Sequence, residues 1–262
     1  MNILLVEPEI NGHHFAMYVR FLVRGMVNKN YNFSILTSKK IKNHAVLDIL
    51  KNETKNIKFY YLDELRYPKK KNFFSLLTFQ IANFRIIKNA FNEVIKKENF
   101  DHIFLTTIDH IDKVIPFMGS PFGKYNFSSI ILNPKNHFNY FKISNLQLKT
   151  ILYNYFTYKI LKLSNLKNLY SNDIFFVKYI NKFFPKQKKK LIFFEEPVEL
   201  KNLINKNRAK SKLKLNKSDF IVLVYGAIKS SKSIKELTEI IKKKEIDKKI
   251  RLLVCGEQTI DI

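Results

Sequence analysis

Residues 11–14 contain a glycine and two histidines between an apolar segment and a stretch with helical spacing, which suits them to ligand binding. Gly12 allows a ligand to approach the backbone closely, and the start of a helix presents unpaired N–H groups to an anion or a sugar hydroxyl. His13 or His14 can act there as a base or as a hydrogen-bond partner. In the alternative interpretation, Asn11 only caps the helix and both histidines are solvated. No G-x-G-x-x-G pattern is present, so these residues are not a dinucleotide fingerprint.

Polar residues also follow two later segments that are predicted to be strands. Thr106, Thr107, Asp109 and His110 end or follow the segment 102–106. Because ligands of doubly wound sheets bind at the carboxyl ends of strands, these side chains are predicted to line the rim of one cleft. The alternative is that Thr107 or Asp109 only caps the next helix. The residues after the next predicted strand, Asn133, Pro134, Asn136 and His137, repeat the pattern with weaker support.

A turn rich in small residues, 226–233, is the third candidate and contains Gly226, Lys229 and Lys232. Backbone N–H groups, the helix dipole and ammonium charges can together hold a diphosphate at such a turn. The spacing of a Walker motif is not met. In a chain with 47 lysines and arginines, two lysines in a turn can equally be solvated.

Other catalytic classes have no support in the sequence. The six histidines lack the helical pairing of a metal site, and no nucleophile-elbow motif accompanies a serine. The single cysteine, Cys255, stands in an apolar run and fits a buried strand in a reducing compartment. We expect neither a metal nor a cofactor.

The elements that must position these residues alternate between strands and helices. Short apolar segments predict strands at residues 2–6, 33–37, 57–62, 102–106, 128–132, 168–170 and 190–194. Helical spacing predicts helices at residues 13–27, 45–50, 73–97, 146–163 and 173–184, and one that begins near residue 109. This order opens a doubly wound parallel sheet, so the predicted fold class is α/β.

A change of composition after residue 198 predicts a second domain. Residues 199–217 are rich in Lys and Asn and are predicted to link a domain of residues 1–198 to one of residues 218–262. In the second domain, strands are predicted at 220–225 and 251–255 with a helix at 231–243 between them. Two strands and one helix cannot cover both faces of a parallel sheet, so we expect this second Rossmann-like domain to be incomplete.

The formal charge of +25 favours attraction to anionic surfaces. Only six of the 47 basic residues are arginine, which suits phosphate and base contacts best, so nucleic acid is not expected as a partner. The N-terminal segment lacks the basic leader and the length of a signal peptide, and no long uncharged apolar run occurs. We therefore expect a cytoplasmic location, with peripheral contact at the inner face of the membrane as a further interaction.

Four segments give the chain a resemblance to the GT-B glycosyltransferases, closest to glycosyltransferase family 4. Residues 2–19, with Gly12, look like the family's first strand and glycine-containing acceptor loop. Residues 193–198, Phe-Phe-Glu-Glu-Pro-Val, look like the strand and acidic turn that lead into the second domain. Residues 220–237 look like the first strand and donor-diphosphate loop of that domain, and residues 252–256 match its second strand. The likeness spans the whole chain.

The resemblance implies a hexosyltransferase-like enzyme of polysaccharide biosynthesis. Such an enzyme transfers a sugar from a nucleoside-diphosphate sugar to a glycan or lipid-linked acceptor. The resemblance further implies that the acceptor is bound by Gly12, His13, Asp109 and Asn133, and that His14 and His110 are catalytic. The donor diphosphate would be held by Gly226, Lys229 and Lys232, although Ala227 stands where the family usually has a basic residue.

The family's E-x7-E segment is expected beyond Ile262, which implies truncation within the C-terminal donor-binding domain. We therefore expect weak activity, or none, from this chain alone. Two alternatives remain open. The chain is a non-catalytic binding or partner subunit completed by another chain, or it is a basic α/β protein that binds anionic membrane or nucleic acid. The scarcity of arginine disfavours the latter.

Overall fold

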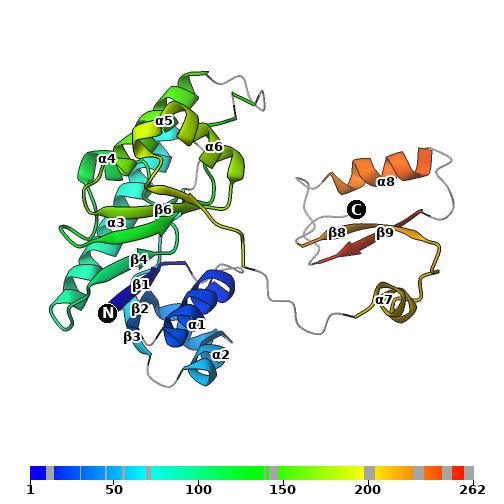
Figure 1. Cartoon of the computed structure of the whole chain (residues 1–262), viewed down its shortest axis with the longest axis horizontal. Helices are drawn as coiled ribbons and strands as arrows, with labels where there is room; N and C mark the ends of the chain where they lie inside the picture. Colours follow the sequence, from blue (N-terminus) through cyan, green and yellow to red (C-terminus); the bar gives the residue numbers. More distant parts are fainter. Residues whose placement is uncertain are drawn as a thin grey trace. The chain divides into compact units, whose positions relative to one another are not determined.

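The computed structural model describes residues 1–9, 15–29, 31–44, 46–54, 57–68, 72–138, 140–141, 147–197, 204–226, 233–243 and 250–256 (Figure 1). The chain divides into two compact units, Met1–Val198 and Glu199–Ile262. Strands and helices alternate in both units, so the fold class is α/β, as predicted.

A parallel sheet of seven strands forms the centre of the first unit, in the order β3-β2-β1-β4-β5-β6-β7. Its strands are β1 (Asn2–Glu7), β2 (Asn32–Ser38), β3 (Lys58–Leu62), β4 (His102–Leu105), β5 (Phe127–Ile130), β6 (Leu166–Ser171) and β7 (Leu191–Phe193). The chain moves outward from β1 to β3 and then returns to place β4 on the other side of β1. This reversal makes a topological switch point between β1 and β4, where such sheets bind ligands.

Helices connect the strands of this sheet. They are α1 (Arg20–Asn28), α2 (Val46–Glu53), α3 (Phe73–Ile95), α4 (Ile115–Met118), α5 (Gln147–Leu161) and α6 (Ile174–Phe183). A π-helical turn, η1 (Phe15–Val19), leads into α1, and 3-10 turns form η2 (Lys39–Asn43) and η3 (Pro185–Gln187). The prediction of a helix from about residue 109 is wrong. Residues 109–114 form turns, and α4 begins only at Ile115. Gly119, with φ of 73°, ends it after one turn.

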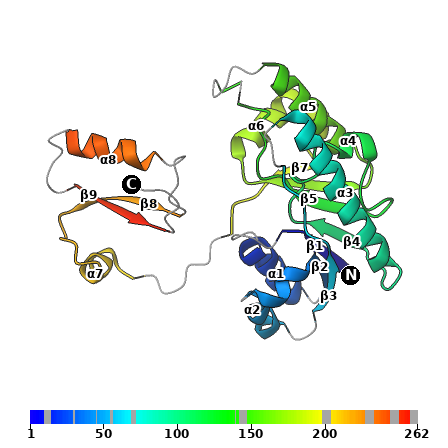
Figure 2. The ribbon, with the colours of Figure 1, turned by 180° about the vertical axis from the view of Figure 1, so that it is seen from behind.

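Two apolar cores cover the two faces of the sheet. Side chains of β1 alternate between them, with Ile3 and Leu5 in the core under α1 and α2, and Leu4 and Val6 in the other. The second core is larger because α3, α5 and α6 all contribute to it. Figures 1 and 2, seen from opposite sides, show α3 behind and then in front of the sheet, across from α1 and α2. Buried aromatic side chains such as Phe84 contribute roughly 2–3 kcal/mol each to this packing.

The second unit contains two parallel strands, β8 (Phe220–Tyr225) and β9 (Ile250–Cys255), and the helices α7 (Lys206–Lys212) and α8 (Ile234–Lys243). Helix α7 lies within residues 199–217, which the sequence predicted to be a linker. The ammonium group of Lys210 donates to the carbonyl oxygens of Lys217 and Asp219, at 2.7 and 2.6 Å, and so ties α7 to the start of β8. Cys255 lies in β9 but is half-buried, not buried as predicted. None of the described helices is long and apolar enough to cross a membrane.

Candidate active site

The switch point of the sheet brings together the residues that follow β1 and β4. The two strands pair as far as Val6 and Leu105, so Glu7 lies beside the loop that starts at Thr106. The backbone N–H and the hydroxyl of Thr106 both donate to the Val6 carbonyl oxygen, at 3.0 Å each. These bonds hold the start of the loop after β4 against the end of β1, at the edge where a ligand crevice is expected.

A histidine and a carboxylate meet at this edge. Nε2 of His110 lies 3.0 Å from a carboxylate oxygen of Glu9, and the two side chains are 15% and 23% exposed. Burial lowers the pKa of His110, but the hydrogen bond to Glu9 and the nearby carboxylate charges outweigh it, so the net effect raises this pKa above its ordinary value. An imidazole that a carboxylate orients has the properties of a general base.

Tyr67 closes one side of this pair. Its ring packs edge-on against the imidazole of His110, with the ring centroids 6.3 Å apart. Burial and a hydrogen bond to Glu9 raise the pKa of Tyr67, so its phenol remains protonated and donates to the Glu9 carboxylate. Glu9 is thereby held by a second side chain while it bonds His110.

Glu7 places a buried carboxyl group beside the pair. It is 1% exposed, and its Oε1 accepts a hydrogen bond from the backbone N–H of Glu9 at 2.9 Å. Its Oε2 has no hydrogen-bond partner among the described residues. Burial raises the pKa of Glu7 to about 7, against the opposing effects of the Glu9 N–H and of His110. Glu7, Glu9 and His110 therefore form a cluster of ionisable side chains in which the pKa values of Glu7 and His110 are both raised.

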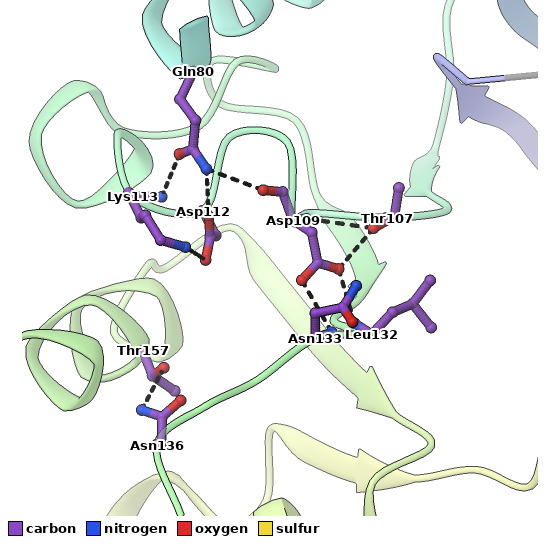
Figure 3. A network of polar contacts seen from close by, with 9 residues as sticks. All are labelled: Gln80, Thr107, Asp109, Asp112, Lys113, Leu132, Asn133, Asn136 and Thr157. Atoms are coloured by element: carbon purple, nitrogen blue, oxygen red, sulfur yellow. Dashed lines mark hydrogen bonds and ion pairs between the residues drawn. The ribbon is translucent and has the colours of Figure 1, made fainter. Parts of the chain in front are cut away.

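Asp109 anchors the loop after β4 to the loop after β5 (Figure 3). Its carboxylate accepts hydrogen bonds from the Thr107 hydroxyl at 2.8 Å, and from the backbone N–H groups of Leu132 and Asn133 at 2.8 and 3.1 Å. It does not cap a helix, because α4 starts only at Ile115. The anchor fixes the position of the backbone that carries His110.

Gln80 of α3 holds the other side of the same loop (Figure 3). Its amide nitrogen donates to the Asp109 carbonyl oxygen at 3.0 Å and to Oδ1 of Asp112 at 2.8 Å, and its amide oxygen accepts the N–H of Lys113 at 2.8 Å. The ammonium of Lys113 lies 2.5 Å from Oδ2 of Asp112. A cavity of about 190 Å³ borders these residues, with walls from α3, α5 and the loops after β4 and β5.

Comparison with known proteins identifies the architecture. No protein-family model matches the sequence, and no curated protein matches it. Among solved structures, sucrose-phosphate synthase from Thermosynechococcus elongatus is similar with a TM-score of 0.61 at 16% identity, over 97% of this chain and 62% of that chain. Arabidopsis thaliana UGT89C1 complexed with quercetin is similar with a TM-score of 0.54 at 12% identity, over 99% of this chain and 69% of that chain. A glycosyltransferase from Rickettsia africae is similar with a TM-score of 0.50 at 14% identity, over 98% of this chain and 68% of that chain.

This chain has the GT-B fold. It spans 62% to 69% of the three solved chains.

Within the GT-B fold, the structure gathers three of the residues that the sequence predicted. His110 and Asp109 stand on one loop, and Asn133 begins the neighbouring loop, where its N–H is bonded to Asp109. Five others lie outside the described residues: Gly12, His13, His14, Lys229 and Lys232.

Sequence reasoning missed Glu7, Glu9 and Tyr67. An acid that ends an otherwise apolar strand, followed by proline, was the available signal for Glu7. No spacing rule joins Glu9 or Tyr67 to His110, because each comes from a different connection of the sheet.

A further bond joins two segments that carried the family resemblance. The Tyr18 hydroxyl of η1 donates to a carboxylate oxygen of Glu196 at 2.8 Å, and burial together with this bond raises the pKa of Tyr18. The acidic turn at the end of the first unit is thus tied to the start of the chain.

The weaker candidates after β5 are engaged in packing contacts. His137 is 3% exposed, and its Nε2 lies 3.2 Å from a carboxylate oxygen of Asp173, which caps α6 through the Phe176 N–H. Burial lowers the pKa of His137, although Asp173 opposes this effect. Asn136 donates to side chains of α5. In the part of the chain that the structure describes, no group of three acidic, histidine or cysteine side chains converges as a metal site.

The predicted diphosphate turn starts at a close backbone contact. Gly226 has φ of 92°, and its N–H donates to the Cys255 carbonyl oxygen at 2.9 Å. A Cβ at Gly256 would collide with the carbonyl oxygen of Gly226. The carboxyl ends of β8 and β9 therefore need glycine at both positions.

Proposed function

We propose that this chain carries the acceptor side of a glycosyltransferase. The enzyme moves a sugar from a nucleoside-diphosphate sugar to a glycan or lipid-linked acceptor. The observation that carries the proposal is the Glu9–His110 pair at the switch point of a GT-B sheet. UGT89C1, which shares this fold, has been solved complexed with UDP and with quercetin, a donor-side and an acceptor-side molecule for such a reaction.

In this proposal His110 is the general base. Glu9 occupies Nε2, which leaves Nδ1 to accept the proton of an acceptor hydroxyl. As the O–H bond breaks, the oxygen forms a bond to the anomeric carbon of the donor sugar. The bond from that carbon to the diphosphate oxygen breaks, and the electron pair leaves with the diphosphate. The Glu9 carboxylate stabilises the imidazolium that forms, as the acid of a catalytic triad does.

The second unit is proposed to hold the leaving diphosphate. Gly226 starts a strand-to-helix turn, and Lys229 and Lys232 follow it in the sequence. Backbone N–H groups at the start of a helix and ammonium groups stabilise the negative charge that develops on the diphosphate.

The proposal is tested by measuring nucleoside diphosphate release and sugar transfer with a panel of nucleotide sugars and glycan or lipid-linked acceptors. His110→Ala is expected to reduce kcat by about 10²- to 10⁴-fold, the usual contribution of a general base. The matched control is His102→Gln, because His102 stands at the opposite end of β4 and contacts Ser128 Oγ at 3.0 Å. Equal rates for wild type and His110→Ala would refute the assignment.

The assay is run on two forms of the protein, because the chain spans only part of the solved GT-B structures it resembles. One form is residues 1–262, for which we expect weak transfer or none. The other is the product of any reading frame that continues past the Ile262 codon with an E-x7-E segment. Robust transfer by residues 1–262 alone would overturn the expectation of weak activity and leave the general-base assignment to be judged from His110→Ala.

A further inference from the structure

We propose that the cavity beside the His110 loop binds one neutral pyranose ring, the terminal sugar of the acceptor. The inference rests on the proposed function and names its acceptor class. Asp109, Asp112 and Lys113 of this loop line the cavity. Figure 3 shows how their side chains lie. Its polar walls are completed by Asn133, Asn136 and Tyr153.

The size of the cavity limits the ligand. At about 190 Å³ it is smaller than the roughly 300 Å³ at which pockets for drug-sized ligands begin. One six-membered ring with its hydroxyl groups suits that space, whereas a nucleotide or a disaccharide does not. Leu76, Phe156 and Ile160 form apolar parts of the wall, against which the C–H groups of a sugar ring can pack.

The charges around the cavity cancel. The Lys113 ammonium lies 2.5 Å from Oδ2 of Asp112, and Oδ1 of the same carboxylate accepts the Gln80 amide. Asp109 already accepts three hydrogen bonds. Lys135 also lines the cavity, so the two carboxylates of Asp109 and Asp112 are matched by two ammonium groups and the walls carry no net charge. A ligand without net charge therefore suits the site.

Hydrogen-bonding groups of both kinds remain available in the walls. Among the described residues, the Tyr153 hydroxyl and the Asn133 side-chain amide have no partner. Asn136 uses its amide hydrogens on Asn154 and Thr157, at 3.0 Å each, which leaves its carbonyl oxygen as an acceptor. A ligand whose hydroxyl groups both donate and accept satisfies such a set, and a sugar has this property.

The test measures binding without a donor, so it does not depend on turnover. Saturation-transfer NMR of residues 1–262 is recorded with methyl β-D-glucopyranoside and methyl β-D-galactopyranoside, and with D-glucuronate and glycerol as comparisons. We expect saturation transfer to at least one pyranoside, weaker transfer to glucuronate and none to glycerol. Asn133→Phe, a change at an exposed loop residue, is expected to fill the cavity and lower the affinity at least tenfold.

A second variant guards against a folding artefact. Lys113→Met removes the ammonium, and Lys97→Met is its control, because Lys97 is exposed and does not line the cavity. Lys113→Met is expected to weaken pyranoside binding while Lys97→Met leaves it unchanged. The inference is overturned if no pyranoside binds, if glucuronate binds more tightly, or if binding survives both Asn133→Phe and Lys113→Met. If His110→Ala binds the pyranoside and transfers sugar as well as wild type does, the assignment of His110 as general base is refuted. The proposed sugar site is not affected by that result.

Discussion

Replacing Glu7 by glutamine isolates the effect of burying a carboxyl group at the switch point. The pKa of Glu7 rises from an ordinary 4.5 to about 7 because the side chain is buried. At about 1.4 kcal/mol for each pKa unit, this difference corresponds to about 3 kcal/mol. Because the folded state binds the proton more tightly than the unfolded state, ionisation of Glu7 lowers the free energy of unfolding. This loss of stability is absent below pH 4.5, grows between pH 4.5 and 7, and is complete above pH 7.

Glu7→Gln cannot ionise, so it escapes this penalty. The free energy of unfolding of the variant, relative to that of wild type, should therefore rise by about 2–3 kcal/mol as the pH is raised from 5 to 8. The cost of burying the amide is the same at every pH and does not alter this rise. Urea unfolding of the first unit, followed by far-UV circular dichroism at several pH values, measures the change. Glu64→Gln is the control for the loss of one carboxylate, because the side chain of Glu64 is 60% exposed. A stability difference that is the same at pH 5 and pH 8 would show that Glu7 does not carry a raised pKa, and the account of the cluster would fail.

Four further predictions follow from other contacts. Glu9→Gln removes the carboxylate that raises the pKa of His110, so a proton NMR titration should show the imidazole pKa falling; an unchanged midpoint contradicts the pairing. Asp109→Ala leaves three donors without their acceptor and should lower the free energy of unfolding by roughly 2–4 kcal/mol in urea, with Asp109→Asn costing less. A hydrogen bond from Arg20 lowers the pKa of Glu53. The contribution of this carboxylate to the free energy of unfolding is therefore present above pH 4.5 and is lost as the pH falls through the lowered pKa. Glu53→Gln should therefore cost about 1 kcal/mol at pH 7 and nothing in strong acid; a cost that persists in acid argues against an ionic contribution. The charge of +25 predicts sedimentation with phosphatidylglycerol vesicles at low salt and release at high salt, and equal binding to phosphatidylcholine would contradict an electrostatic origin.

Much of the sheet was predictable because its strands are short apolar runs between helical segments. Each predicted strand of the first unit overlaps a strand of the structure. Residues 109–114 departed from prediction because the loop has nonlocal partners. Asp109 bonds backbone groups after β5, and Gln80 of α3 bonds Asp112, so side chains far away in the sequence hold these residues in turns.

The same limit applies to the candidate site. His110 was found because a polar residue after a predicted strand stands at the carboxyl edge of the sheet. Its partner Glu9 was not found, because the pairing depends on β4 returning to lie beside β1. The burial of Glu7 was also not predictable, because its residue type does not indicate that the side chain is only 1% exposed. This burial is what raises the pKa of Glu7.

The sequence by itself thus determined the class of fold, the order of its elements and the edge of the sheet where chemistry belongs. These follow from periodicity and residue type, which act over a few neighbouring residues. Only the tertiary structure decided that Glu9 meets His110, that Glu7 is buried beside them, and that a neutral cavity opens next to their loop. Those features arise from contacts between segments far apart in the chain, and strand order, which local patterns do not encode, brings them together.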